Sequence, residues 1–122
     1  MKTVRIALAV AAATMVSAIA VASSSAATPA KLTATVGSGF TITLVDSSGK
    51  KVTHLEAGTY VITVRDRSGM HNFELRGPGL NEQETSVPGT GTVRWTLNLR
   101  KGSYLYVCDP HASTMRGSFV VS

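Results

Sequence analysis

Three side chains that can bind a metal lie close together near the C-terminal end of the chain. Cys108 is the only cysteine, His111 follows it by three residues, and Met115 comes four residues later. Soft sulfur donors favour copper(I), and two histidines, one cysteine and a weak axial methionine form the ligand set of a blue-copper electron-transfer site. The segment lacks the second histidine, so another part of the chain must supply it. His71, in the sequence Met-His-Asn-Phe, is the obvious candidate.

The single cysteine strengthens the metal hypothesis. Small domains outside the cytoplasm usually pair their cysteines, and an unpaired thiol there is open to oxidation unless it is buried or bound to a metal. A buried, chemically inert cysteine is the alternative, but the nearby histidine and methionine favour a ligand. Zinc also accepts cysteine and histidine, although structural zinc sites usually offer four strong nitrogen or sulfur donors. A thioether beside a thiolate therefore favours copper.

The N-terminal segment predicts export. Lys2 and Arg5 precede an apolar run over residues 6–22 that is rich in alanine and valine, and small residues follow it. This order is typical of a cleaved secretory signal peptide. An uncleaved membrane anchor is the alternative, disfavoured because the run is short and interrupted by polar residues. We expect residues 1–27 to be a signal peptide and residues 28–122 to form one domain in the periplasm or outside the cell.

The charge of the expected mature domain argues against nucleic-acid binding. The whole chain carries a formal net charge of +5, and removing Lys2 and Arg5 leaves +3. The basic residues are scattered rather than gathered into a stripe, and aromatic residues are not interleaved with them. This mild charge is compatible with an acidic redox partner or an anionic membrane surface, but nothing after the signal segment indicates membrane association.

The rest of the chain predicts β-strands separated by turns. Apolar and polar residues alternate over four stretches, a period of two that indicates strands with one buried face. The expected inward residues are Leu32, Ala34 and Val36; Phe40, Ile42 and Leu44; Tyr60, Ile62 and Val64; and Val93, Trp95, Leu97 and Leu99. No stretch after residue 27 has a sustained helical period, and residues 77–91 form the one long loop. We therefore predict a single all-β domain, an antiparallel Greek-key β-sandwich.

These strands place the metal-binding side chains at one end of the sandwich. In the strand expected over residues 103–108, alternation puts Cys108 on the same inward face as two tyrosines. The turn that follows, stiffened by a proline, returns His111 and Met115 to that end. His71 lies after a separate turn and reaches the same end from a neighbouring loop.

A longer motif is the most specific signal in the chain. It reads Gly-x-Tyr-x-Tyr-x-Cys-x-Pro-His up to His111, with Met115 after it and a His-Asn pair upstream. This motif resembles the plastocyanin-like branch of the cupredoxins, over essentially the whole expected mature chain. The resemblance implies one copper ion, with His71, Cys108 and His111 as equatorial ligands and Met115 as the axial ligand. Three residues separate His111 from Met115, where related proteins commonly have two or four, so the loop length bears on the axial bond.

The resemblance also implies roles for residues around the ligands. Asn72 resembles the asparagine that ties the two ligand loops together in this family. His54 lies in a polar stretch and is interpreted as a surface residue. His111 is expected to reach the surface and to be the place where redox partner proteins dock on a monomer. The small or apolar residues expected to ring it are Pro78, Leu80, Pro110 and Ala112.

The sequence therefore predicts an exported electron-transfer protein that cycles one copper ion between Cu(II) and Cu(I). A copper carrier or storage protein is the alternative, but such proteins tend to use exposed clusters of methionine or histidine, which this chain lacks. An enzyme is not expected. Three histidines are too few for a second copper centre, and no Ser/His/Asp set or carboxylate pair has a useful spacing.

Overall fold

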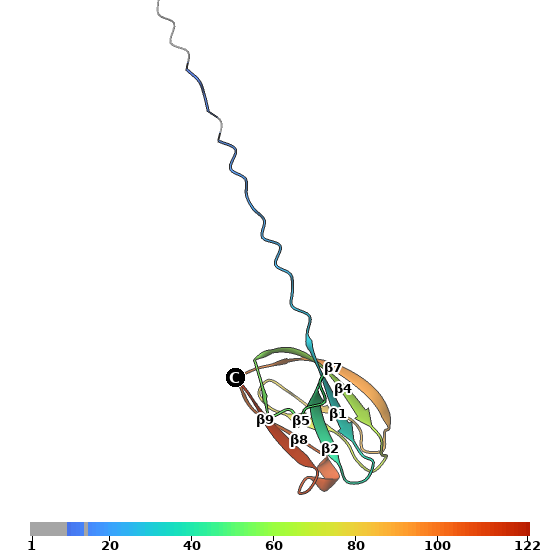
Figure 1. Cartoon of the computed structure of the whole chain (residues 1–122). Coiled ribbons are helices and arrows are strands. Elements are labelled where there is room, and N and C mark those ends of the chain that lie inside the picture. The colour runs from blue at the N-terminus through green and yellow to red at the C-terminus, as the bar shows by residue number, and fades with distance from the viewer. Residues whose placement is uncertain (1–9, 14) are drawn as a thin grey trace, which may run out of the picture.

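The computed structural model describes residues 10–13 and 15–122. The described residues before Ala30 form no helix or strand, and Figure 1 shows them running away from the domain as an extended segment. The expected signal peptide falls partly on residues 1–9 and 14, which lie outside the described residues. Among the residues described, no helix has the length and apolar character needed to cross a bilayer.

Two β-sheets make up the domain. The first has the order β2-β1-β4-β7, with β1 (Ala30–Val36), β2 (Ile42–Asp46), β4 (Gly58–Asp66) and β7 (Gly91–Leu99). The second has the order β3-β9-β8-β5-β6, with β3 (His54–Leu55), β5 (Glu74–Arg76), β6 (Gln83–Glu84), β8 (Gly102–Val107) and β9 (Arg116–Val121). A single turn of 3-10 helix, η1 (Asp109–His111), joins β8 to β9. The predicted all-β sandwich is confirmed.

The pairing of the strands is mixed rather than purely antiparallel, which corrects one part of the prediction. β1 and β4 run parallel with Ala30 opposite Tyr60, and β3 and β9 are also parallel. The other pairings are antiparallel. Alternating side chains occur in both kinds of ladder, so the sequence pattern could not distinguish them.

One hydrophobic core lies between the sheets and holds most of the expected inward residues. The alternation in β1 and β4 is confirmed, because their inward apolar side chains are all buried. Along the edge strand β7 burial is graded: Leu99 is fully buried whereas Val93 is 44% exposed. The loop expected over residues 77–91 is also interrupted, because β6 pairs there with β5.

The end of the sandwich where β8 begins is held by Tyr104. Its ring stacks on Phe119 at 5.1 Å between centroids. Its hydroxyl accepts a hydrogen bond from the Arg100 amide (2.9 Å) and donates to the Arg100 carbonyl (2.9 Å), with the Pro78 carbonyl at 3.3 Å. A Cβ on Gly77 would lie 2.2 Å from this ring, so any larger residue there would force the ring to shift. We call this end the tyrosine pole.

The opposite end, where β8 finishes, carries the expected metal-binding residues, and we call it the metal pole. It comprises η1, the β1–β2 turn and the loop from β4 to β5. Figure 1 shows η1 and the β1–β2 turn at the bottom of the view, while the extended N-terminal segment joins β1 at the top. The N-terminal segment and the metal pole are therefore at opposite ends of the sandwich.

Candidate metal centre

The turn after β8 brings Cys108, His111 and Met115 together through its own backbone. The Cys108 carbonyl accepts from the His111 amide (3.1 Å), and the His111 carbonyl accepts from the Met115 amide (2.8 Å). The Cys108 amide in turn donates to the Met115 carbonyl (3.0 Å). Pro110 fits the start of η1, where a helix leaves its amides unpaired. The spacing in the sequence thus produces a closed turn in which backbone hydrogen bonds join the three residues.

A second loop, between β4 and β5, supplies His71. The buried carboxylate of Asp66, at the end of β4, accepts from the Ser68 amide (3.1 Å). The Ser68 hydroxyl accepts from the Met70 amide (3.2 Å), and the Ser68 carbonyl from the His71 amide (3.4 Å). This turn buries His71 under the loop of Cys108, and β5 begins only at Glu74. Local side-chain bonds of Asp and Ser are typical of such turns.

The donor atoms of three expected ligands form a compact triangle. The Nδ1 atoms of His71 and His111 lie 3.0 Å apart, and each lies 3.6 Å from Cys108 Sγ. In a triangle with these sides the point equidistant from the corners is about 2 Å from each corner, close to the metal–imidazole and metal–thiolate bond lengths of protein sites. The three residues therefore fit a single metal ion as they stand.

Burial and donor chemistry define what this triangle can hold. Cys108 and His71 are buried, and His111 is partly exposed. Met115 is also buried, and its backbone is bonded to the residues on either side of the site, Cys108 and His111. A thiolate, two imidazoles and a neighbouring thioether are the donor set of a copper site. His54, by contrast, is exposed and contacts the Ser122 hydroxyl at 2.5 Å, as expected of a surface residue.

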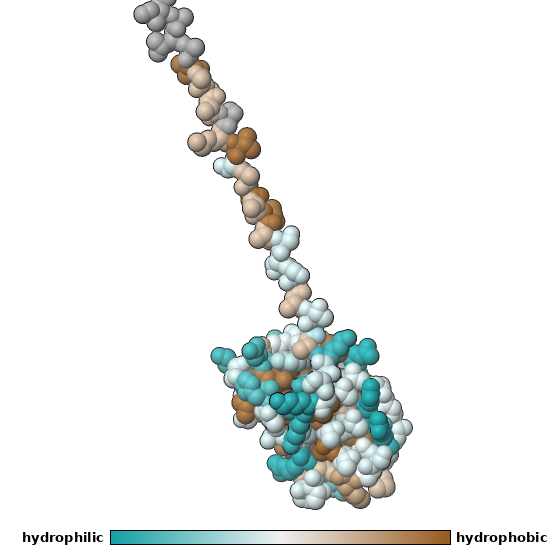
Figure 2. Space-filling view, viewed as in Figure 1, coloured by the Kyte–Doolittle hydropathy of each residue, from teal (hydrophilic) through white to brown (hydrophobic). Residues whose placement is uncertain are grey.

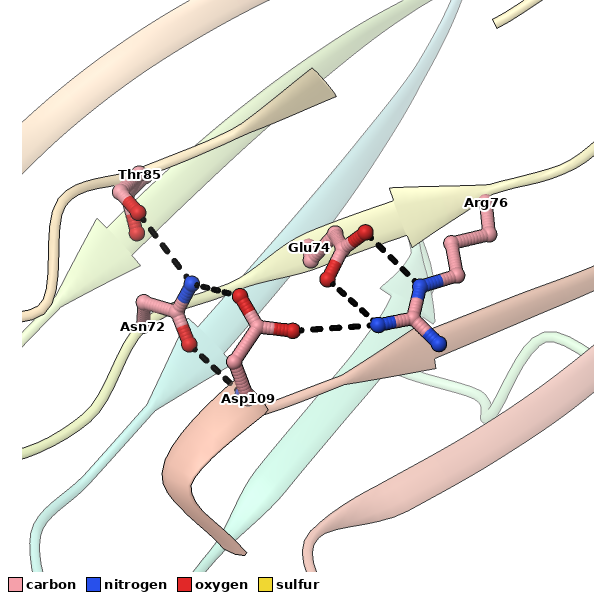
Figure 3. A network of polar contacts seen from close by, with 5 residues as sticks. All are labelled: Asn72, Glu74, Arg76, Thr85 and Asp109. Atoms are coloured by element: carbon pink, nitrogen blue, oxygen red, sulfur yellow. Dashed lines mark hydrogen bonds and ion pairs between the residues drawn. The ribbon is translucent and has the colours of Figure 1, made fainter. Parts of the chain in front are cut away.

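Asn72 ties the two loops together. Its Oδ1 accepts from the Asp109 amide (2.8 Å), and its Nδ2 donates to Asp109 Oδ2 (2.7 Å) and to the Thr85 carbonyl (3.3 Å). Figure 3 shows Asn72 lying between these two partners. Because Asn72 follows His71 and Asp109 follows Cys108, this amide fixes the two ligand loops relative to each other. The tie expected from the sequence is present.

A group of carboxylates surrounds Asp109. Oxygen atoms of Glu74, Glu84 and Asp109 lie within 4.8 Å of one another, and Arg76 reaches into the group. Burial acts to raise the pKa of Asp109, but hydrogen bonds within the group and from Asn72, together with the charge of Arg76, hold it below its usual value. Partial desolvation and then the charges of Asp109 and Glu74 raise the pKa of Glu84. Sequence reasoning did not find this group, since its members come from three separate segments.

Phe40 is the other residue at the metal pole that the sequence did not reveal. It was expected in the core, but it precedes β2 and is 63% exposed. Its ring lies edge-on against both histidines, with centroids 5.2 Å from His71 and 5.0 Å from His111. Glycines with positive φ precede it in the β1–β2 turn, at Gly37 and Gly39. That Gly-Ser-Gly turn was the only available signal that the strand pattern breaks here.

Two of the residues expected to ring His111 lie elsewhere. A Cβ on Gly102 would lie 2.6 Å from the Pro78 ring, so Pro78 sits beside the first residue of β8, at the tyrosine pole. Leu80 belongs to the same turn, because its amide donates to the Gly77 carbonyl. β8 extends over six residues from Gly102, so Gly102 lies roughly 20 Å from the metal pole. Pro110 and Ala112 remain beside His111 by chain connection, and Phe40 lies against its ring.

Comparison with known proteins agrees with this architecture. The family of copper binding proteins described as plastocyanin/azurin matches residues 30–122. Among solved structures, reduced rusticyanin is 23% identical with a TM-score of 0.54, covering 75% of this chain and 78% of that one. A methionine-to-leucine variant of rusticyanin is 23% identical with a TM-score of 0.55, covering 75% and 76%. No curated protein matches the sequence significantly.

These likenesses and the donor triangle lead to one conclusion. At this level of identity, rusticyanin supports the cupredoxin fold alone. The family match extends over the whole sandwich, and the Cys, His and Met side chains gathered at its metal pole fit one copper ion. The chain belongs to the plastocyanin/azurin family of copper-binding proteins.

Proposed function

We propose that the protein is an exported electron carrier that uses one copper ion and has no catalytic activity of its own. The observation that carries this proposal is the donor triangle of His71, Cys108 and His111, whose atoms lie 3.0 and 3.6 Å apart. When bound, copper supplies a one-electron couple between Cu(II) and Cu(I). Donors already fixed by buried packing and loop hydrogen bonds change little between oxidation states, which favours fast electron transfer.

Each of the four residues has a proposed part in holding the ion. Cys108 would provide the thiolate, and His71 and His111 would provide imidazole Nδ1 atoms. Met115 would provide the thioether as the weak fourth ligand, a role supported by its burial and its two backbone bonds to the ligand turn. His111 is the partly exposed member of the set, so it is the proposed point where electrons enter and leave.

Export of the domain is supported by the segment before β1. We propose that residues 1–27 are a signal peptide and that residues 28–122 work in the periplasm or outside the cell. Figure 2 shows brown apolar side chains along the extended segment, away from the domain. Those side chains are 84–95% exposed: Val10, Met15, Val16, Ile19 and Val21. Apolar residues that no part of the sandwich covers are unfavourable in water, so removal by a signal peptidase accounts for them.

Partner docking is proposed at the metal pole. Phe40 and Met70 are large apolar side chains that are well exposed there, on the two loops beside His111. Weak redox encounters use small interfaces, and a monomer with one such apolar surface suits them. The partner is proposed to be a redox protein that docks over His111.

The proposal is tested by adding Cu(II) to the purified domain and recording the visible spectrum and the copper content. One copper per chain and a strong thiolate-to-copper band are expected, with the band absent in Cys108→Ser and unchanged in His54→Ala. A Cys108→Ser protein that keeps the band would overturn the metal site.

A second measurement separates an electron carrier from a copper carrier or store. An electron carrier should show rapid electron self-exchange between its Cu(I) and Cu(II) forms. It should also keep its ion against a moderate chelator in both oxidation states. Rapid loss of Cu(I) to the chelator, with slow self-exchange, would instead assign copper carriage and leave the ligands intact.

A further inference from the structure

Arg76 extends from β5 to the loop that carries two of the proposed ligands. Its Nε and Nη2 donate to the two carboxylate oxygens of Glu74 at 2.7 and 2.9 Å. The same Nη2 donates to Asp109 Oδ1 at 3.2 Å. Figure 3 shows both carboxylates on the same side of the guanidinium, each joined to it by dashed lines. The planar fork of an arginine suits this bridging geometry, which a lysine could not reproduce.

Asp109 is held from both sides. Arg76 binds its Oδ1, while Asn72 binds its Oδ2 at 2.7 Å and its amide at 2.8 Å. Asp109 directly follows Cys108 and begins η1. The position of its carboxylate is therefore linked to the amide that ties the two ligand loops.

Stability alone does not account for this arrangement. The Arg76 side chain is 53% exposed and that of Asp109 is 35% exposed. Ion pairs at this level of exposure contribute little to folding because water and salt screen them. Their location matters more, because a charge near a redox centre shifts the balance between two oxidation states that differ by one unit of charge.

The local charge balance depends on this one arginine. Glu74, Glu84 and Asp109 place three carboxylates within 4.8 Å, and Arg76 is the cation that contacts them in the described part of the chain. Without it, Asp109 would face the carboxylates of Glu74 and Glu84 with no cation in contact with the group, and Asn72 would be its remaining amide partner. Repulsion would then act directly on the link between the ligand loops.

We propose that Arg76 is a positioning residue for the copper centre, acting through Asp109. It holds the Asp109 carboxylate in the Asn72 tie and offsets its charge, which keeps the two ligand loops closed and the reduction potential raised. The inference rests on the proposed function, since it concerns the electron-transfer property of the same site.

The experiment uses Arg76→Gln, Asp109→Asn and the double variant, with Arg94→Gln as a matched control. Arg94 is an exposed arginine on β7, in the other sheet, so its loss makes the same change in net charge. Arg76→Gln should lower the reduction potential, and Asp109→Asn should raise it because a negative charge near the ion favours Cu(II). The shift caused by Arg76→Gln should be at least halved in the Asp109→Asn background. It should also shrink in high salt, which screens exposed charges.

A second readout does not need copper. In the metal-free domain the Asp109 amide, bonded to Asn72 Oδ1, should exchange its hydrogen several-fold faster in Arg76→Gln and at the wild-type rate in Arg94→Gln. The positioning role would be overturned if Arg76→Gln shifted the reduction potential equally in the wild-type and Asp109→Asn proteins. It would also be overturned if Arg76→Gln left the exchange of the Asp109 amide unchanged. Failure of the wild-type domain to show the thiolate band would overturn the proposed function instead, and the amide measurement would still decide the role of Arg76.

Discussion

The two poles of the sandwich are each tied by one buried polar side chain, but the ties have different surroundings. At the tyrosine pole the Tyr104 hydroxyl bonds to backbone groups of Arg100 and Pro78, and its ring is stacked on Phe119. At the metal pole the Asn72 amide bonds to Asp109 and Thr85. One tie is embedded in aromatic packing, and the other joins two loops that carry donor atoms.

This difference indicates what each pole contributes. Hydrogen bonds inside a packed aromatic cluster add to the burial of large apolar surface, so the tyrosine pole contributes chiefly to the free energy of unfolding. Hydrogen bonds between loops add little apolar burial but restrict the positions of His71 and Cys108, which they flank. The metal pole should therefore affect copper binding and redox properties more than it affects folding.

The largest effect should come from removing one of the proposed ligands at the metal pole. Replacing His71 with glycine removes one corner of the donor triangle and leaves space beside the ion. Copper affinity should fall by more than the roughly 10–100-fold typical of losing a residue that only supports a ligand. Added imidazole should bind in the vacated place and alter the visible spectrum.

The control for this prediction is His54→Ala, on the surface of β3. It should leave the spectrum and the response to imidazole unchanged, since His54 is exposed and contacts only Ser122 among the described polar groups. If the two variants gave the reverse results, the second histidine ligand would have been misassigned.

The next effect concerns the tyrosine pole and should be one of stability. In Gly77→Ala the new Cβ would lie 2.2 Å from the Tyr104 ring, which must shift against Phe119. Overpacking of this kind costs about 1–3 kcal/mol of unfolding free energy. Denaturant unfolding of the metal-free domain measures it, and the copper spectrum of the folded variant should be that of the wild type.

Gly69→Ala is the matched control for that steric argument. Gly69 lies in the loop of His71, yet the nearest atom to its new Cβ would be the Pro88 carbonyl oxygen at 3.5 Å, an ordinary contact. Gly69→Ala should therefore lower the unfolding free energy by less than Gly77→Ala does, although Gly69 is closer to the metal pole. Equal losses in the two variants would contradict the difference in packing between the poles.

How well the fold and the candidate site could be predicted from the sequence depends on how far apart along the chain the contacting residues lie. Cys108, His111 and Met115 lie within one turn, so their spacing alone predicted that they meet. His71 needed the family resemblance or elimination, because it comes from a different loop.

Contacts between distant segments were not predictable. The Arg76–Asp109 pair joins residues 33 positions apart, and exposed charges carry no periodic pattern. Phe40 follows the alternation of the next strand but lies outside it, because alternation predicts the faces of a strand and not where the strand begins. The parallel pairing of β1 with β4 was missed for a related reason, because parallel and antiparallel strands show the same alternation of apolar and polar residues.

A direct comparison of the two ties should show a smaller but more selective effect. Tyr104→Phe removes the hydroxyl bonds and Asn72→Ala removes the amide bonds. Each should cost about 0.5–1.5 kcal/mol, the net contribution of a typical hydrogen bond, because the bonds that are lost are only partly buried. Only Asn72→Ala should also speed copper loss, by about 10–100-fold. Denaturant unfolding and transfer to a chelator provide the two measurements. If Tyr104→Phe accelerated copper loss as much as Asn72→Ala does, the two poles would not make separate contributions to folding and to copper binding.

The smallest effect on folding should come from Phe40, and it isolates the surface of the metal pole from its interior. Phe40 is largely exposed, so Phe40→Ala should change the unfolding free energy by no more than about 0.5 kcal/mol, as for other surface positions. Its ring nevertheless touches both histidines, and it forms part of the surface where docking is proposed. Electron self-exchange should therefore slow several-fold while copper is retained. Val93→Ala, an exposed apolar position on β7, is the control and should leave self-exchange unchanged. Equal self-exchange rates in Phe40→Ala and wild type would show that electrons do not pass through this face, and the docking surface would have to be sought away from His111.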